Sequence, residues 1–296
     1  MRREEVAIIG AGPAGLSTAL QLKRHGVEAL LFERDCIGGL LRNANLVENY
    51  PGFPGGVPGT VLVRLFEEQA QAACVEVTLD EVIDLTYTEG TFRITTPARA
   101  YGARIVVVAS GTRPGTFPDD WAPAHLRDRI LYEVYPLLHE TDKRIVIVGA
   151  GDAAFDYALN LSRRNDVLIL NRGDQTHCLP LLRERVAASP RIRYCDNMAV
   201  VRVESSSENG LSLECTGPAG PVRFEADYVV GAIGREPQLA FMSDRLLAAA
   251  RDLESQGMLY FVGDVKNGRF RQTAIAVGEG ILTAMKIHAR LQEITP

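Results

Sequence analysis

Two glycine-rich turns in the sequence have the residue types and spacing that bind a pyrophosphate. The first, Gly10–Gly15, reads Gly-x-Gly-x-x-Gly; the apolar run 6–9 precedes it and a helical pattern of leucines and alanines follows. In such a segment the first glycine permits a tight turn, the second lets phosphates approach the backbone, and the third lets the helix pack close to the strand. The phosphates then lie on free N–H groups at the positive end of the helix.

An acidic residue ends the second strand expected in this unit. The run Val27–Phe32 leads into Glu33, where a carboxylate can accept hydrogen bonds from the hydroxyls of an adenosine ribose. A glycine turn between ordinary elements would be the simpler interpretation of the first motif alone. Strand, turn, helix and acid in this order predict a dinucleotide site instead.

The same pattern begins again near the middle of the chain. An apolar strand, 144–148, leads into Gly149–Ala154, which reads Gly-x-Gly-x-x-Ala, and the run 167–170 predicts the next strand. An internal repeat of this kind indicates two nucleotide-binding units, and two dinucleotides in one chain indicate electron transfer between them. A duplicated unit that has lost its ligand is the alternative, and the intact glycine signature argues against it.

The second unit has no acid after its second strand. Asn171 and Arg172 stand there, and an arginine can pair with a 2′-phosphate that an acid would repel. The second site is therefore expected to prefer NADPH, with NADH as the alternative. A solvated surface arginine would carry no such preference.

A third motif lies near the end of the chain. A predicted strand ends in Gly263-Asp264, and a helix is expected to open at Thr273 or Ala274. An acid at a strand end can bind a ribityl hydroxyl, and a helix N-terminus can stabilise the negative charge of a reduced flavin. A capping aspartate in an ordinary strand–loop–helix is an equally good interpretation of this motif alone.

Composition excludes several classes of protein. The net charge of −5 argues against nucleic acid as a partner, and no apolar run approaches the ~20 residues of a membrane helix. Residues 2–5 lead straight into a strand, so no signal peptide is expected. The five cysteines include no Cys-x-x-Cys, and the adjacent pair His177-Cys178 could suggest a metal site but lacks a second pair of ligands. We therefore expect a cytoplasmic protein with reduced thiols, no metal and no membrane partner.

The remaining segments predict further elements and two breaks. Glycine and proline between residues 38 and 56 exclude a helix or a central strand, and a helix is expected around residues 62–70. The runs 75–79, 82–87 and 92–95 predict short strands in an antiparallel hairpin region, and 104–109 a buried strand. The prolines of 114–123 and Pro237 indicate crossings between domains.

Taken together, the motifs resemble those of the low-molecular-weight thioredoxin reductases and of the thioredoxin-reductase-like ferredoxin/flavodoxin–NADP reductases. The resemblance is carried by residues 10–15, 38–40, 47–52, 109–112, 149–154, 232–235, 263–265 and 271–272. It implies an α/β fold of two Rossmann-like, three-layer domains. The FAD domain would be discontinuous, 1–113 and 238–296, with an NAD(P)H domain of 114–237 inserted. A homodimer is usual for this family.

The resemblance also assigns cofactor contacts. It implies Glu33 at the adenosine ribose, Val82 near the adenine, Asp264 at the ribityl chain and Gln272 at the ring edge; Gly39, Leu40 and Asn49 would come near the isoalloxazine. The FAD site would comprise Gly10, Gly12, Pro13, Ala14, Gly15, Glu33, Arg34, Gly39, Leu40, Asn49, Val82, Ala109, Gly111, Thr112, Asp264, Arg271, Gln272, Thr273 and Ala274. The NADPH site would comprise Gly149, Gly151, Asp152, Ala153, Ala154, Asn171, Arg172, Ile233, Gly234 and Arg235.

One departure from thioredoxin reductases affects the chemistry. Their redox-active Cys-x-x-Cys precedes the second glycine turn, and at that spacing this chain has Tyr132-Glu133-Val134-Tyr135. The two tyrosines either stack near a cofactor ring or pack between domains. Cys36, near the predicted flavin loop, is either a redox thiol or a small buried residue. No side chain is expected to act as acid, base or nucleophile, because the chemistry would occur at N5 of the flavin.

Without that dithiol, reduced FAD would pass electrons directly to an external acceptor. Ferredoxin or flavodoxin is the first expectation, and a small-molecule disulfide, a quinone or dioxygen is the second. A flavin- and nucleotide-binding regulatory protein without turnover is the alternative from another class.

Overall fold

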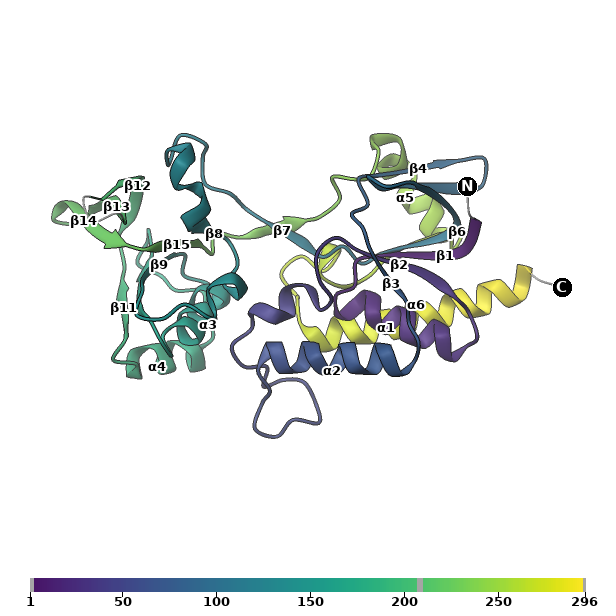
Figure 1. Cartoon of the computed structure of the whole chain (residues 1–296), viewed down its shortest axis with the longest axis horizontal. Coiled ribbons are helices and arrows are strands. Elements are labelled where there is room, and N and C mark those ends of the chain that lie inside the picture. Colours follow the sequence, from purple (N-terminus) through teal and green to yellow (C-terminus); the bar gives the residue numbers. More distant parts are fainter. Residues whose placement is uncertain (1–2, 207–209, 295–296) are drawn as a thin grey trace. The chain divides into compact units, whose positions relative to one another are not determined.

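The computed structural model describes residues 3–206 and 210–294, and these form two compact units (Figure 1). The first unit comprises 1–42, 47–113 and 236–296, and the second comprises 43–46 and 114–235. Strands β7 (Thr112–Pro114) and β16 (Arg235–Pro237), at the two crossings of the chain, pair as a small two-stranded sheet.

The first unit is built on a seven-stranded sheet with β1 (Arg3–Ile9) near its middle. On one side of β1 lie β2 (Ala29–Glu33) and β3 (Val77–Leu79), all parallel. On the other side lies β6 (Ala100–Val108), which pairs in parallel with both β1 and β17 (Leu259–Phe261). An antiparallel hairpin of β4 (Asp84–Thr88) and β5 (Thr91–Thr95) extends the sheet beyond β6.

Layers cover both faces of this sheet because successive side chains of each strand point to opposite faces. Val6 and Ile8 pack with α1 (Pro13–Arg24), α2 (Gly59–Ala72) and α6 (Thr273–Ile294). Ala7 and Ile9 pack in a second cluster with the β4–β5 hairpin and α5 (Asp244–Ser255). The parallel strands are buried on both faces, which explains their nearly continuous apolar sequences.

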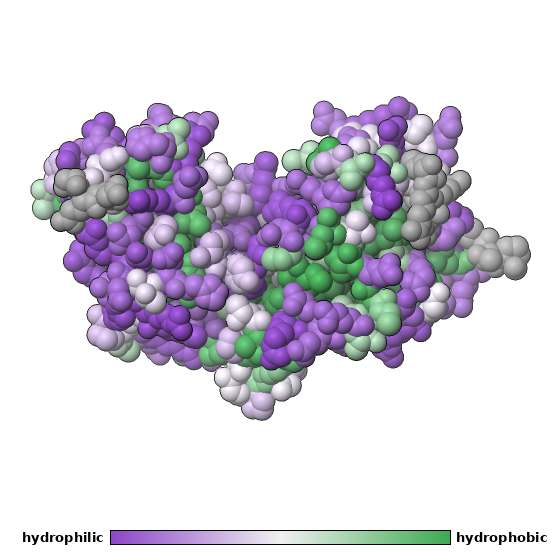
Figure 2. All heavy atoms as spheres, viewed as in Figure 1, coloured by the Kyte–Doolittle hydropathy of each residue, from purple (hydrophilic) through white to green (hydrophobic). Residues whose placement is uncertain are grey.

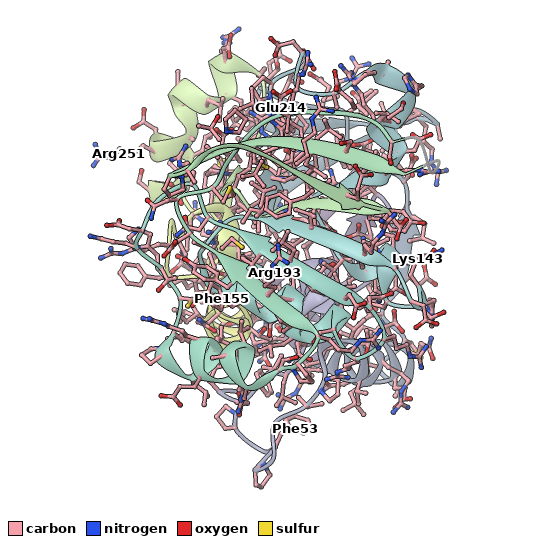
Figure 3. All side chains as sticks on the ribbon, turned by 90° about the vertical axis from the view of Figure 1, so that its left-hand side faces the viewer. Phe53, Lys143, Phe155, Arg193, Glu214 and Arg251 are labelled. Atoms are coloured by element: carbon pink, nitrogen blue, oxygen red, sulfur yellow. The ribbon has the colours of Figure 1, made fainter. Side chains whose placement is uncertain are left out.

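The second unit repeats the arrangement on a smaller scale. Its parallel sheet has the order β11 (Ile192–Cys195), β10 (Asp166–Leu170), β9 (Arg144–Val148), β15 (Tyr228–Gly231) and β8 (Ile130–Leu131). Helices α3 (Asp152–Leu161) and α4 (Pro180–Ala188) belong to this unit. Phe155 of α3 is fully buried in its core, and Arg193 lies on β11 over the ring of Phe224 (Figure 3). Strands β12 (Ala199–Ser205), β13 (Leu211–Gly217) and β14 (Gly220–Ala226) form a separate antiparallel sheet.

The structure confirms both strand–turn–helix predictions, the β4–β5 hairpin and the start of α6 at Thr273. The placement of residues 75–79 in the hairpin region was wrong, because β3 pairs in parallel with β2. The predicted loop between 38 and 56 contains a short 3-10 helix, Gly39–Asn43, since isolated glycines exclude regular α-helix but not a single tight turn.

The compact units differ from the expected domain bounds in two places. Residues 43–46 cluster with the second unit, although 1–113 was expected to form one domain with the chain's end. Glu236 and Pro237 cluster with the first unit. Within the described residues, no helix combines the length and the hydropathy needed to cross a membrane.

Candidate nucleotide-binding sites

The first glycine turn is held in its shape by close backbone contacts. Gly10 has φ +104°, and a Cβ on it would lie 2.5 Å from the carbonyl oxygen of Ala109. A Cβ on Gly15 would lie 1.8 Å from the carbonyl oxygen of Gly10, so α1 starts directly against the turn. No atom lies within 4 Å of the place where a Cβ of Gly12 would stand. The turn therefore leaves open space at the position expected for a phosphate.

The first turn of α1 contains no acidic side chain. Gly12 is the N-cap of the helix and makes no side-chain cap, and Pro13 opens the helix. Gly38 donates its N–H to the carbonyl of Ala11 at 2.9 Å, and a Cβ on Gly39 would lie 3.4 Å from Cα of Gly12. The 3-10 helix with Leu40 therefore begins beside the glycine turn. Free N–H groups of the helix can bind a phosphate there.

Glu33 connects β2 to the glycine turn. Its carboxylate is buried; Oε2 accepts from the N–H of Ala11 at 2.9 Å and Oε1 from the N–H of Asp35 at 3.1 Å. Each carboxylate oxygen keeps a further acceptor site. Glu33 can therefore fix the backbone of the turn and still accept hydrogen bonds from ribose hydroxyls.

A cavity adjoins Glu33 at the carboxyl ends of β1 and β2. It opens to solvent, and Gly10, Glu33, Arg34, Val82 and Gln238 contribute to its lining. The acidic side chains at its edge would repel a further phosphate on the ribose but accept hydrogen bonds from free hydroxyls. The cavity thus suits the adenosine of a dinucleotide without a 2′-phosphate.

The other predicted flavin contacts come from segments far apart in the sequence. Asn49 donates from Nδ2 to Oε1 of Gln272 at 2.9 Å. Asp264 lies in the 3-10 helix Gly263–Val265. Arg271 lies just before α6, and Thr273 and Ala274 are the first two residues of that helix. Ala109, Gly111 and Thr112 follow β6, with Ala109 and Thr112 buried.

Glu279, which the sequence analysis did not single out, holds the Asp264 segment in place. Its Oε2 accepts from the N–H of Gly263 at 2.7 Å and from Nδ2 of Asn267 at 3.1 Å. An acid one and a half turns into a predicted helix looks like a solvated residue, so only the folded chain reveals this contact. The open space at Gly12, the first turn of α1 without an acid, and the cavity with acidic lining fit FAD, and these residues would hold it.

The second glycine turn has the same backbone contacts. Gly149 has φ +146°, a Cβ on it would lie 2.3 Å from the carbonyl oxygen of Ala232, and Gly151 has open space. Ala154 is fully buried in the third position, whereas Ala153 is exposed. The turn can therefore accept a pyrophosphate as the first one does.

The segment after β10 lies against this second turn. His177 donates its N–H to the carbonyl of Ala150 at 2.9 Å, and Leu179 donates its N–H to Oδ1 of Asp152 at 2.7 Å. Asp152, expected at the cofactor, is thus already engaged by the backbone of this segment. Among the described residues, no group of three or more His, Cys, Asp or Glu side chains could hold a metal ion.

The two residues at the end of β10 differ in their surroundings. Asn171 is buried; its Nδ2 donates to the carbonyl of Gln175 at 3.0 Å and to the hydroxyl of Tyr194 at 2.9 Å. Arg172 is exposed and makes no ion pair with a described residue. Asn171 therefore shapes the turn, while the guanidinium of Arg172 is available to a phosphate.

The remaining residues predicted for the NADPH site lie at and just after the end of β15. Ile233 is 41% exposed, and the carbonyl of Gly234 accepts from the N–H of Gly115 at 3.0 Å. Arg235 contacts Glu133, Nη2 to Oε1, at 3.5 Å. The structure thus engages Arg235 in an ion pair and leaves the side chain of Ile233 at the surface.

The two tyrosines at the position of the missing dithiol have unlike environments. The hydroxyl of Tyr132 accepts from the N–H of Phe117 at 2.9 Å, and a Cβ on Gly231 would lie 2.7 Å from the Tyr132 ring. Tyr135 is 41% exposed. The ring of Tyr132 therefore packs inside the second unit, and not between domains as the structural alternative expected.

Residues 43–46 make a further contact that the sequence analysis missed. Asn43 is buried, and its Oδ1 accepts from the N–H groups of Val134 and Tyr135 at 3.1 and 2.9 Å. The N–H of Asn45 donates to Oδ2 of Asp156 on α3 at 2.9 Å. The only sequence signal is a pair of asparagines inside a glycine- and proline-rich stretch.

The five cysteines are free thiols. Burial raises the pKa of Cys215 to about 11, and burial also raises the pKa of Cys36 and of Cys178 above the ordinary value. Arg42 donates a hydrogen bond to Sγ of Cys36, but its charge does not offset the burial. These three thiols are therefore protonated at neutral pH, which disfavours them as nucleophiles.

Comparison with known proteins identifies the family. The model of the pyridine nucleotide-disulphide oxidoreductase family matches residues 4–280. The chain therefore belongs to this family. Within it, the chain is similar to thioredoxin reductases, the class that its motifs resemble. The resemblance drawn from the motifs and the α/β fold with two Rossmann-like units are confirmed.

Three relatives illustrate the likeness. A bifunctional thioredoxin reductase/thioredoxin of Mycobacterium leprae is 28% identical over 310 residues, which cover 98% of this chain and 66% of that protein, slightly less than two thirds of its length. The solved thioredoxin reductase of T. acidophilum is 25% identical with a TM-score of 0.82, and the match covers all of both chains. The bacillithiol disulfide reductase Bdr of Bacillus cereus has the same fold, with a TM-score of 0.74 at 17% identity, over 98% and 100% of the two chains.

Proposed function

We propose that this protein is an FAD-dependent NADPH oxidoreductase whose reduced flavin passes electrons directly to an external acceptor. FAD, when bound, supplies a ring that accepts a hydride at N5 and releases the electrons to an acceptor. The chain's own residues bind and orient the two dinucleotides. The observation that carries the proposal is a pair of intact nucleotide turns in a family member without a Cys-x-x-Cys.

The first unit would hold FAD. The open space at Gly12 and the uncapped N-terminus of α1 would take the pyrophosphate. Glu33 would accept from the ribose hydroxyls, and Val82 would lie at the adenine in the cavity that both line. Asp264, held in its segment through Glu279, would bind the ribityl chain.

The second unit would bind NADPH. Gly151 leaves room for the pyrophosphate, and the exposed guanidinium of Arg172 would pair with the 2′-phosphate. The segment 173–179 would border this site, because His177 and Leu179 are hydrogen-bonded to the turn. NADH would bind without the arginine contact and therefore more weakly.

A ferredoxin or flavodoxin is the first acceptor we propose. Both exchange electrons with a reduced flavin without a thiol on the donor, and this chain has no Cys-x-x-Cys. A small-molecule disulfide is the second candidate, supported by the shared fold of Bdr, whose name specifies a disulfide substrate.

A homodimer in the cytoplasm completes the proposal. Hydrophobic side chains gather on the visible face of the first unit (Figure 2), and Ile275, Ile281, Leu282 and Met285 of α6 are exposed. A second copy that covers this helix would bury them. Light scattering gives the mass in solution and tests this part of the proposal directly.

An acceptor panel under anaerobic conditions tests the proposed activity. We expect NADPH to bleach the flavin and ferricyanide, ferredoxin or flavodoxin to restore its colour, with thioredoxin ineffective. A small disulfide that restores the colour would select the second candidate. A flavin that NADPH does not bleach would contradict the proposal and favour a regulatory protein without turnover.

A further inference from the structure

Gln238 is held at the carboxyl end of β6 by its own backbone. Its N–H donates to the carbonyl of Gly111 at 3.0 Å, and its carbonyl accepts from Oγ of Ser110 at 2.6 Å. Both contacts are independent of the glutamine side chain. The position of its Cα is therefore fixed in the first unit, beside the segment that contacts Gly10.

Gln238 lines the cavity that Glu33 and Val82 also line. Its side-chain Oε1 is buried and has no hydrogen-bond partner among the described residues. A buried carbonyl oxygen without a donor lowers stability, and such atoms are rare in folded proteins. An unpaired acceptor on a residue that lines a cavity points to a donor on a ligand.

The other polar groups of the cavity define what that donor belongs to. Glu33, Asp80 and Glu81, three acidic residues, also line the cavity. A ligand with several donors and no negative charge at this end would satisfy them. The adenosine of FAD has two ribose hydroxyls and one exocyclic amine, all of which can donate, and its phosphates are accounted for at Gly12.

We propose that Gln238 is a specificity-determining residue of the FAD site, and that its side-chain carbonyl accepts a hydrogen bond from the adenosine half of the cofactor. The inference rests on the proposed FAD site in the first unit. This hydrogen bond would add a contact from the segment 236–296, with which the chain returns to the first unit. The glutamine would help the site retain FAD in preference to a flavin without adenosine.

Gln238→Met tests the contact, because methionine has a similar length and no carbonyl. We expect FAD to leave the variant about three- to tenfold faster than the wild type, as measured by the fluorescence of released flavin. The flavin-free variant should melt at the same temperature as the flavin-free wild type or higher, because a buried unpaired acceptor is gone. Gln256→Met, in the exposed cap of α5, is the matched control and should change neither quantity.

FAD analogues identify the donor. Analogues that lack the adenine amino group or one ribose hydroxyl should bind the wild type more weakly than FAD does. One of these analogues lacks the group that donates to the carbonyl of Gln238. That analogue and FAD should bind Gln238→Met equally well, because the variant has no carbonyl to accept the bond. Whether this analogue lacks the amino group or a hydroxyl identifies the donor, and either result supports the proposal.

Two results would overturn the inference while leaving the flavoprotein assignment intact. One is an unchanged rate of FAD release from Gln238→Met. The other is a faster release accompanied by a lower melting temperature of the flavin-free variant, which would mark Gln238 as a structural residue only. A wild-type chain that takes up no FAD would instead overturn both this inference and the proposed function.

Discussion

The two glycine turns of this chain share a backbone and differ in what surrounds them. At the first, Glu33 is buried and bonded to the turn, and Gly39 lies close to Gly12. At the second, Asn171 stands after β10 in place of the acid, and the exposed Arg172 follows it. Helix α3 begins with an acid, Asp152. The first turn is therefore bordered by a buried acid and a close glycine, whereas the second has an exposed arginine beside it.

This difference matches two kinds of ligand. A cofactor that stays bound through many turnovers benefits from enclosure, since each buried contact slows its release. A reductant that must bind and leave in every cycle needs an accessible site. The same turn can thus serve a resident FAD in one unit and a transient NADPH in the other, with the surroundings as the deciding factor.

The third position of each turn gives the largest expected contrast. A Cβ on Gly15 would lie 1.8 Å from a backbone oxygen, whereas Ala154 already fills the matching position. Gly15→Ala should cost about 3 kcal/mol or more of unfolding free energy and remove bound FAD. Ala154→Gly should cost about 1 kcal/mol and leave the FAD content unchanged. Denaturant unfolding measures the free energy of each variant, and the flavin content per chain measures its bound FAD. Full FAD content in Gly15→Ala would contradict the expected contrast between the two turns.

Arg172 gives the next largest effect. An arginine–phosphate contact contributes about 1.5–3 kcal/mol, so Arg172→Ala should raise the KM for NADPH about tenfold and leave that for NADH nearly unchanged. Arg223→Ala, an exposed arginine on β14, is the control and should alter neither. Equal effects of Arg172→Ala on the two nucleotides would remove the assignment of the 2′-phosphate to this residue.

The thiols give a smaller effect that appears only at alkaline pH. Cys215 is fully buried, and burial raises its pKa to about 11 in the folded chain. Its contribution to stability is therefore complete below the ordinary pKa near 9 and is lost as pH rises through 11. Cys215→Val should remove about 2–3 kcal/mol of this alkaline loss. Urea unfolding at pH 8 and pH 11 measures it, and an identical pH dependence in both proteins would show that Cys215 ionises freely.

Local sequence determined the parts of the fold that were predicted correctly. Both glycine turns, the hairpin of β4 and β5 and the start of α6 depend on residues within a few positions of one another. The pairing of β3 with β2 depends on where α2 returns the chain, which strand propensity does not contain. The hairpin interpretation of residues 75–79 failed for that reason.

For the candidate sites, the sequence predicted the residues in motifs but not those that act through distant contacts. Gly12, Gly151, Glu33 and Arg172 belong to motifs with fixed spacing, so their positions followed from the sequence. Gln238 and Glu279 act through contacts with residues distant in the sequence or on a different element. Asn43 bonds to a segment about 90 positions away. Such contacts become visible only once the chain has folded.

We propose that electrons pass from reduced FAD to the acceptor without a redox-active dithiol in the protein. An anaerobic reductive titration of the purified flavoprotein tests this route, because every redox-active group takes up its own electrons. We expect the flavin to be fully bleached after about two electrons per FAD, with no thiols formed beyond the five already present. Uptake of about four electrons per FAD would reveal a redox-active disulfide and exclude this route.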